Sequence, residues 1–289
     1  MKISFNESCT LKNSTLERDL TLCEDAGFSF IELRIDKLRE YLRNHTRDQL
    51  QSFFRKNKLM PYAMVGIHAY KELFSDEDDE SHREQFLEDF WFGCEILCAV
   101  GAKNMIVVPP LFTENENRNY TDTWQKRLED NVRIFSRLSE MAKNYSINLG
   151  IKIIDAPRCS VRTVQECNAI LDAVGTPNVG YTLDPFNFYL NKKDDSFTDL
   201  SALYPDRIFV VHVNGADGAA LAQSARTYPD TGVMNVGNYL KALQKLGYDG
   251  PISLDISRDE EWKKNPEDVI HKAAASMREI LRRNGLLEG

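Results

Sequence analysis

The sequence lacks the features that mark membrane, secreted and nucleic-acid-binding proteins. No apolar run approaches the ~20 residues that a membrane span requires, and residues 1–6 (MKISFN) lack the apolar region of a signal peptide. The six cysteines form no CxxC pair, and the 36 basic residues are outnumbered by 44 acidic ones, with no long Lys/Arg cluster. The sequence therefore predicts a protein of the reducing cytoplasm that has neither a membrane nor a nucleic acid as partner.

Stretches rich in Pro, Gly or Ser, which would separate domains, are also absent, as are low-complexity segments. Of the 289 residues, 42% are hydrophobic, which is enough for a sizeable core and excludes global disorder. This length suits one α/β barrel. We therefore expect a single domain over residues 1–289.

Short apolar runs of strand type recur along the chain and alternate with amphipathic stretches of helical period. The expected strands are Lys2–Asn6, Phe28–Ile35, Met60–Ile67, Asn104–Pro109, Asn148–Ile154, Val179–Phe186, Arg207–Val213 and Pro251–Ile256. Eight strand–helix units predict a (β/α)8 barrel, the TIM-barrel fold. A doubly wound open sheet is the alternative, but it would usually carry a GxGxxG loop after the first strand, where residues 6–10 read NESCT.

Helix boundaries are marked by capping residues. Segments 14–17 (STLE) and 163–166 (TVQE) have the capping-box pattern, and 265–267 (NPE) places Pro at a first helical position. The acidic run 76–80 is expected to begin a helix, because acids are favourable at a helix N-terminus. Four glycines are expected to end helices and lead into strands: Gly27, Gly101, Gly175 and Gly247.

Polar side chains interrupt four successive apolar strands near their C-terminal ends, which is where barrel enzymes carry their active sites. They are Lys152, Asp184, His212 and Asp255. Buried polar groups need partners, and neighbouring strand ends are within side-chain reach. The four residues predict a small-molecule site, and a buried structural salt-bridge cluster is the alternative.

Further residues near the same end of the barrel are candidates for contacting a substrate. Arg226 could anchor an anion or a hydroxyl group, and its alternative is a solvated loop arginine. Glu32 is expected to pair with Arg34 or Arg226. His68 ends the third strand and Trp262 could wall a pocket, although each could also be structural. The full set of substrate-binding candidates is Arg226, Glu32, His68, Asn187, Trp262 and Arg258.

Several motifs along nearly the whole chain resemble one enzyme family. They are SFNES at 4–8, GFSFIELR at 27–34, DKLREYL at 36–42, Cys159, LDPFNF at 183–188, FVVHV at 209–213, RTYP at 226–229 with Gly232, and GYDGPISLD at 247–255. The chain resembles the inosose isomerases, which belong to the xylose isomerase-like barrels of the sugar-phosphate isomerase/epimerase superfamily. The resemblance implies an isomerase or epimerase of inositol catabolism that acts on a sugar or polyol ketone.

The resemblance also implies a divalent metal ion (Mn, Zn, Co or Mg) at the barrel mouth. The family pattern holds it with Glu, Asp, His and Glu, and the matching positions here are Lys152, Asp184, His212 and Asp255. Asp184, His212 and Asp255 are therefore the candidate metal ligands, whereas a charged lysine has no lone pair to offer. The family's Asp-x-x-His after the sixth strand ends in Asn187 here, which exchanges a catalytic histidine for an amide.

Replacing the ligand Glu and the metal by a single lysine leaves the formal net charge of the site unchanged. Two nearby carboxylates should keep Lys152 charged despite its burial. We therefore expect the ammonium of Lys152 to stabilise an enediolate oxygen, with Asp184, Asp255 or His212 as the base. The mechanism that the resemblance implies is the alternative: a metal polarises the ketone and its adjacent hydroxyl, and a carboxylate or His moves the proton next to the carbonyl. A Schiff base on a neutral Lys152 is a third mechanism.

Two other functions compete with the isomerase. One is a metal-free, non-catalytic barrel that binds a sugar or polyol, which the presence of Lys152 and Asn187 would fit. The other is a metal-dependent abasic-site endonuclease, which the acidic composition and the small number of strand-end histidines disfavour. Homo-oligomers are common among similar barrels, so a homo-oligomer is expected by analogy.

Overall fold

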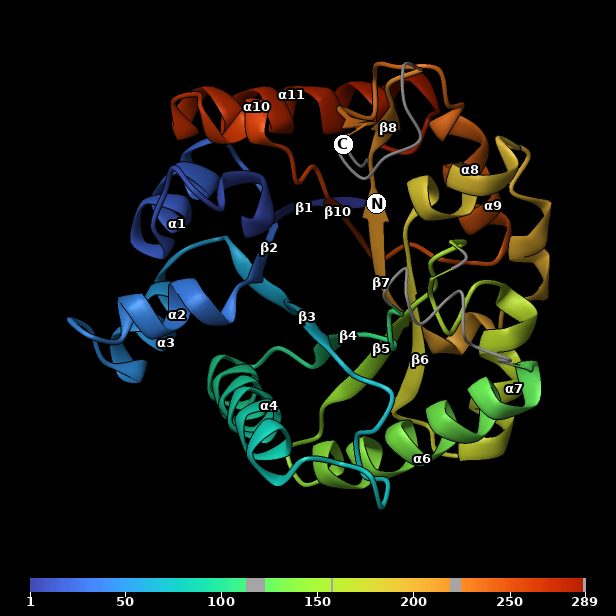
Figure 1. Cartoon of the computed structure of the whole chain (residues 1–289). Helices are drawn as coiled ribbons and strands as arrows, with labels where there is room; N and C mark the ends of the chain where they lie inside the picture. The colour runs from blue at the N-terminus through green and yellow to red at the C-terminus, as the bar shows by residue number, and fades with distance from the viewer. Residues whose placement is uncertain (113–122, 157, 219–224, 288–289) are drawn as a thin grey trace.

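A computed structural model describes residues 1–112, 123–156, 158–218 and 225–287. Eight parallel strands close into a barrel in the order β1-β10-β7-β6-β5-β4-β3-β2, and helices surround it (Figure 1). The strands are β1 (Lys2–Asn6), β2 (Phe30–Leu33), β3 (Met60–His68), β4 (Asn104–Val108), β5 (Asn148–Lys152), β6 (Val179–Leu183), β7 (Ile208–Val213) and β10 (Pro251–Leu254). The predicted barrel is confirmed, and each expected strand overlaps one of these eight.

The helices that cover the barrel follow the strands in alternation. The α-helices are α1 (Leu16–Asp25), α2 (Ile35–Tyr41), α3 (Arg47–Lys56), α4 (Glu80–Val100), α6 (Trp124–Lys143), α7 (Val164–Val174), α8 (Pro185–Lys192), α9 (Val236–Lys245), α10 (Asp259–Trp262) and α11 (Pro266–Arg283). Short 3-10 helices are η1 (Glu7–Thr10), η2 (Thr198–Ala202) and η3 (Pro205–Arg207). A two-stranded antiparallel ribbon joins β8 (Gly215–Ala216) to β9 (Arg226–Thr227).

The capping residues act largely where the sequence indicates. Thr163 caps α7 through the amide of Glu166, and Asp79, from the acidic run, caps α4. The capping box predicted over residues 14–17 is wrong, because the cap is Thr15 rather than Ser14. The Thr15 hydroxyl accepts from the backbone N–H of Arg18, and Arg18 offers no acceptor in return. The four glycines expected after helices all adopt positive φ, between 66° and 81°, a conformation that side chains rarely allow.

The largest boundary error concerns the sixth strand, which ends three residues earlier than expected. The predicted strand ran to Phe186, but β6 ends at Leu183 because Asp184 begins a helix. The Asp184 carboxylate accepts from the backbone N–H of Phe186, and Pro185 occupies the first turn, where its missing N–H costs nothing. One side chain therefore serves as both helix cap and site residue.

Two apolar regions hold the barrel together. The larger joins the strands to the helices around them, and a small separate cluster consists of Tyr62, Ala63, Ile106 and Val210 on β3, β4 and β7. Helices in the described part of the chain all fall short of the length and apolar character that crossing a membrane requires.

A buried charged cluster lies outside the barrel mouth, between η1, α1 and α2. The ammonium of Lys37 contacts Asp19 Oδ2 at 2.5 Å and Thr10 Oγ1 at 3.1 Å, and lies 3.8 Å from Glu7 Oε1. Glu7 in turn accepts from the backbone N–H of Arg34. This group, called the flank cluster below, joins three segments that the sequence analysis did not connect.

Candidate active site

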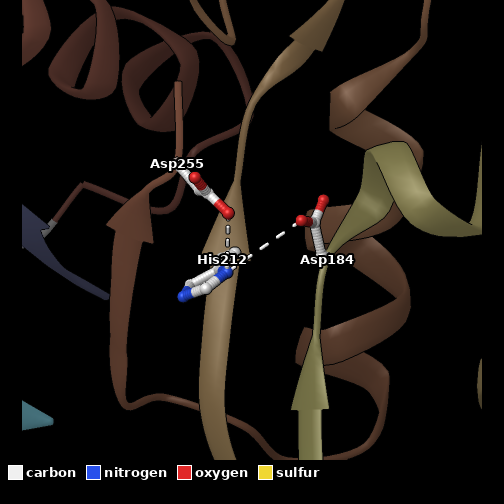
Figure 2. A group of neighbouring side chains, drawn as sticks. All are labelled: Asp184, His212 and Asp255. Carbon is white, nitrogen blue, oxygen red and sulfur yellow. Dashed lines mark ion pairs between the residues drawn. The ribbon is translucent and has the colours of Figure 1, made fainter. Parts of the chain in front are cut away.

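Four polar side chains predicted to converge do meet at the C-terminal end of the barrel. Lys152 is the last residue of β5, Asp184 follows β6, His212 lies on β7, and Asp255 follows β10. Figure 2 shows the carboxylates of Asp184 and Asp255 both directed towards His212. We call these four residues the mouth cluster.

Lys152 lies between the two aspartates. Its Nζ is 2.9 Å from Asp255 Oδ2 and 3.6 Å from Asp184 Oδ2, and 15% of the side chain is exposed. Burial lowers the pKa of Lys152, but the charges of Asp255 and Asp184 outweigh it, and the net shift is upward. Lys152 therefore carries its positive charge at neutral pH.

Both aspartates are held in the ionised form. Burial raises the pKa of Asp184, but Arg226 and Lys152 more than compensate, and the pKa is lowered. The pKa of Asp255 lies well below its usual value because Lys152 and His212 outweigh its burial. The two carboxylates differ in access: Asp184 is fully buried, whereas Asp255 is 6% exposed.

Asp184 is the more completely hydrogen-bonded of the two. Its Oδ2 accepts from Arg226 Nη2 at 2.7 Å, and its Oδ1 accepts from Asn214 Nδ2 at 3.0 Å and from the backbone N–H of Phe186 at 3.1 Å. Asp255 Oδ2 accepts from Lys152 Nζ at 2.9 Å, and its Oδ1 accepts only a long bond, 3.3 Å, from Ser257 Oγ. Asp255 is therefore the carboxylate better placed to reach a substrate.

His212 links the cluster to the opposite wall of the barrel. Its Nε2 lies 3.0 Å from Glu32 Oε1, and its Nδ1 lies 3.3 Å from Asp255 Oδ2. Burial lowers the pKa of His212, but Glu32 and Asp255 together outweigh it and raise this pKa to about 9. Glu32 also accepts from Asn6 Nδ2 at 2.8 Å, so its expected pairing with Arg34 or Arg226 is wrong.

Arg226 lies inside the site, on β9, and is 4% exposed. Besides Asp184, its Nη2 donates to Asn187 Oδ1 at 2.9 Å, and its guanidinium lies over the ring of Phe186. The alternative of a solvated loop arginine is therefore wrong. These contacts make Arg226 a positioning residue for Asp184, and nothing in the structure tests its predicted contact with a substrate.

The other candidates lie around the rim. Trp262 Nε1 donates to the backbone oxygen of Ser8 at 2.9 Å. Arg258 Nη1 donates to the backbone oxygen of Arg226 at 3.1 Å and so supports the ribbon. His68 ends β3, and its residue surface is exposed. Partial burial of its ring and the charge of Lys152 lower its pKa. The binding roles of all three stay predictions.

Two amides that orient the cluster, Asn6 and Asn214, were left out of the predicted site. Both stand at strand ends in the sequence: Asn6 ends the first strand, and Asn214 follows His212 by two residues. Their roles could not be predicted, because each one contacts a carboxylate from a different strand.

Asp184, His212 and Asp255 each offer one ligand atom, and these atoms lie within 4.8 Å of one another, close enough to hold a metal ion. In the described residues no other group of this kind occurs. This single group lacks the ligands of a multi-metal nuclease centre. Lys152 contacts the same Oδ2 atoms that would face the ion.

The sequence profile of the xylose isomerase-like TIM barrel family matches residues 20–280. The chain belongs to this family. It is 30% identical to the inosose isomerase of Halalkalibacterium halodurans, over all of this chain and 99% of that protein. It is also 30% identical to the inosose isomerase of Bacillus velezensis, over 94% of each chain. A crystal structure of the IolI protein with a zinc atom superposes with a TM-score of 0.86 at 27% identity, covering 98% of this chain and 99% of that one.

The resemblance to inosose isomerases is thereby confirmed. A more distant relative, the L-ribulose 3-epimerase of a Methylomonas species, is 23% identical over 80% of this chain and 74% of its own length. As a xylose isomerase-like barrel with relatives of this kind, the chain is an isomerase or epimerase. The non-catalytic alternative has no support among these relatives.

Proposed function

We propose that this enzyme removes a proton from the carbon next to the carbonyl of a cyclic polyol ketone or a ketose, as in the isomerisation of an inosose. The relatives named above support the substrate class. The single observation that carries the mechanism is the buried ammonium of Lys152 between two ionised carboxylates. We also expect the reaction to take place in a reducing cytoplasm, which the free state of all six cysteines supports.

Lys152 supplies the positive charge for this reaction. Removing a proton next to a ketone places negative charge on the carbonyl oxygen, and a fixed cation in a site that excludes water stabilises that charge strongly. Lys152 is anchored by Asp184 and Asp255, so it needs no reorganisation as the charge develops. The raised pKa of Lys152 disfavours the neutral amine that a Schiff base would need.

Asp255 is the proposed base. It is the more exposed aspartate, and Lys152 is its main partner. When a substrate oxygen also binds the ammonium of Lys152, it shares the positive charge that depresses the pKa of Asp255. Binding of the ketone thereby increases the basicity of the carboxylate that removes its proton.

The remaining residues position these two groups. Arg226 and Asn214 fix Asp184, which holds Lys152 from one side, while Glu32 fixes the imidazole of His212 against Asp255. Asn187 is buried, and its Nδ2 has no hydrogen-bond partner in the described structure. An amide cannot relay protons, but this N–H group can donate to a substrate oxygen.

A divalent metal at Asp184, His212 and Asp255 is supported by the grouping of their ligand atoms and by the zinc atom of the IolI structure. When bound, such an ion would polarise the carbonyl as a Lewis acid. In this chain, however, Lys152 holds both carboxylate oxygens, so the group fits an ion only after the lysine withdraws. Every step proposed here therefore uses the chain's own residues.

The test is to assay turnover of 2-keto-myo-inositol and of a ketose before and after EDTA treatment, with elemental analysis of the same protein. Wild type should turn over one of these ketones without a stoichiometric metal, and Lys152→Glu should bind a divalent ion. A wild-type protein that carries one ion per chain and loses activity with EDTA would overturn the role of Lys152. Absence of turnover on both ketones would contradict the substrate class.

A further inference from the structure

A pocket of about 580 Å³ opens beside the mouth cluster, between the ends of β2 and β3 and helices α2 and α4. This volume lies in the range of about 300–1,000 Å³ that small-molecule sites occupy. Its lining includes Arg34, Asp36 and Arg39 on one side and Gln85, Phe86 and Asp89 of α4 on the other. No residue of the mouth cluster lines it, so it adjoins the cluster without being part of it.

Strand register places this pocket next to Lys152. His68, which lines the pocket, pairs with Val108 of β4, and the preceding pair on β4 and β5 is Val107 with Ile151. His68 and Lys152 therefore stand at one level, two strand spacings or about 10 Å apart. A ligand whose reacting carbon lies at Lys152 would extend past His68 into the pocket.

The charged side chains that line the pocket form ion pairs, so their charges cancel. Arg34 binds Asp36 through two parallel bonds, Nε to Oδ1 at 2.9 Å and Nη2 to Oδ2 at 3.0 Å. Arg39 Nη2 binds Asp89 Oδ1 at 2.7 Å, and its Nη1 binds Glu88 of the same helix. A phosphate would have to compete with carboxylates for both guanidinium groups, so the pocket disfavours an anion.

Paired guanidinium and carboxylate groups still offer donors and acceptors side by side. Gln85 adds an amide, and the buried ring of Phe86 adds an apolar surface. Alternating hydroxyl and C–H groups, as on a sugar ring, match such a lining, because each hydroxyl both donates and accepts.

We propose that this pocket binds a second, uncharged hydroxylated ring attached to the reacting polyol ketone, so that the preferred substrates are glycosylated rather than phosphorylated. This inference rests on the proposed function for the position of the reacting ring. It adds a specificity site formed by α2, α4 and the ends of β2 and β3.

The experiment compares the affinities of three unreactive polyols by isothermal titration calorimetry: myo-inositol, a galactosyl-inositol and myo-inositol 1-phosphate. The wild-type protein should bind the galactosyl compound roughly tenfold more tightly than myo-inositol, about 1.4 kcal/mol, and the phosphate no more tightly. In Gln85→Trp, which fills the pocket from the exposed face of α4, the ratio of the first two Kd values should fall to about one. Glu84→Trp is the matched control, exposed on the same helix outside this lining, and should keep the wild-type ratio.

Equal affinity for the glycosylated and simple polyols in wild type, or an unchanged ratio in Gln85→Trp, would overturn the inference. Tight binding of the phosphate would overturn the argument from charge. Asp36→Asn, which frees Arg34, should gain affinity for the phosphate if that argument is right. Failure of all three polyols to bind, with no turnover of 2-keto-myo-inositol, would instead count against the proposed function.

Discussion

Two buried lysines in this barrel each meet two carboxyl groups, and the protonation states that result differ. In the mouth cluster, Asp184 and Asp255 both have lowered pKa values, because Arg226 and His212 add positive charge to that of Lys152. In the flank cluster, Lys37 is the cation facing Asp19 and Glu7, and burial raises the pKa of Glu7 to about 8. The number of cations per carboxylate, more than burial itself, therefore decides whether a buried acid stays ionised.

The flank cluster accommodates its extra acid by keeping a proton. As carboxylates, Glu7 Oε1 and Asp19 Oδ1 would both be buried without a hydrogen-bond partner. A proton on Glu7 that is directed at Asp19 would give each oxygen one partner, and the influence of Asp19 on the pKa of Glu7 agrees with such a contact. The flank cluster is thus structural, whereas the mouth cluster keeps both of its aspartates ionised.

The largest expected difference between the two lysines is in catalysis. Lys152→Met should lower kcat by about 10²–10³-fold, because the enediolate loses its fixed cation. Lys37→Met should leave the kcat of the folded fraction near the wild-type value. Steady-state assays on 2-keto-myo-inositol, with the folded fraction measured by circular dichroism, test this contrast. Equal losses in the two variants would show that the mouth lysine has only a structural role.

The second largest expected difference between the two clusters is in the stability of the fold. Lys37→Met leaves the Asp19 carboxylate buried without its cation and should lower the free energy of unfolding by about 3–5 kcal/mol in urea titrations. The double variant Lys37→Met/Asp19→Leu removes both charges and should recover much of this loss. A double variant less stable than the single one would mean that the pair contributes net stability.

The smallest expected effect, taken per pH unit, is a pH dependence that arises in the flank cluster. Folding raises the pKa of Glu7 from 4.5 to about 8, so the folded state holds this proton more tightly. The stability this provides is fully present below about pH 4.5 and is lost as the pH rises toward about 8. Glu7→Gln should remove a slope of up to about 1.4 kcal/mol per pH unit from urea unfolding free energies. Parallel stability curves for the two proteins would contradict the shared proton.

The barrel could be predicted from the sequence because its signals are local. Apolar runs, caps such as Asn265 and the glycines after helices each depend on a few neighbouring residues. The mouth cluster was predictable for a related reason: parallel strands bring their C-terminal ends to one rim, so polar residues at those ends must meet. The predicted end of the sixth strand was wrong because Asp184, which was expected to lie within that strand, caps a helix instead.

Contacts across the barrel were not predictable in the same way. Glu32 reaches His212 on the far side of the barrel, and Arg226 folds back from a ribbon onto Asp184. These pairings depend on strand tilt and on loop paths that the local sequence does not encode. The flank cluster escaped notice because Asp19 and Lys37 resemble the solvated positions of two amphipathic helices.

Closure of the barrel by β1 and β10 also sets an order of assembly during synthesis. The flank cluster is complete once residue 37 has been made, whereas Lys152 and Asp255 are separated by 103 residues. At about 5–20 residues per second, a ribosome takes about 5–20 s to cover that interval. Throughout it, β10 is missing, the barrel stays open between β1 and β7, and the growing chain carries the lysine of its future active site without the aspartate that will hold it.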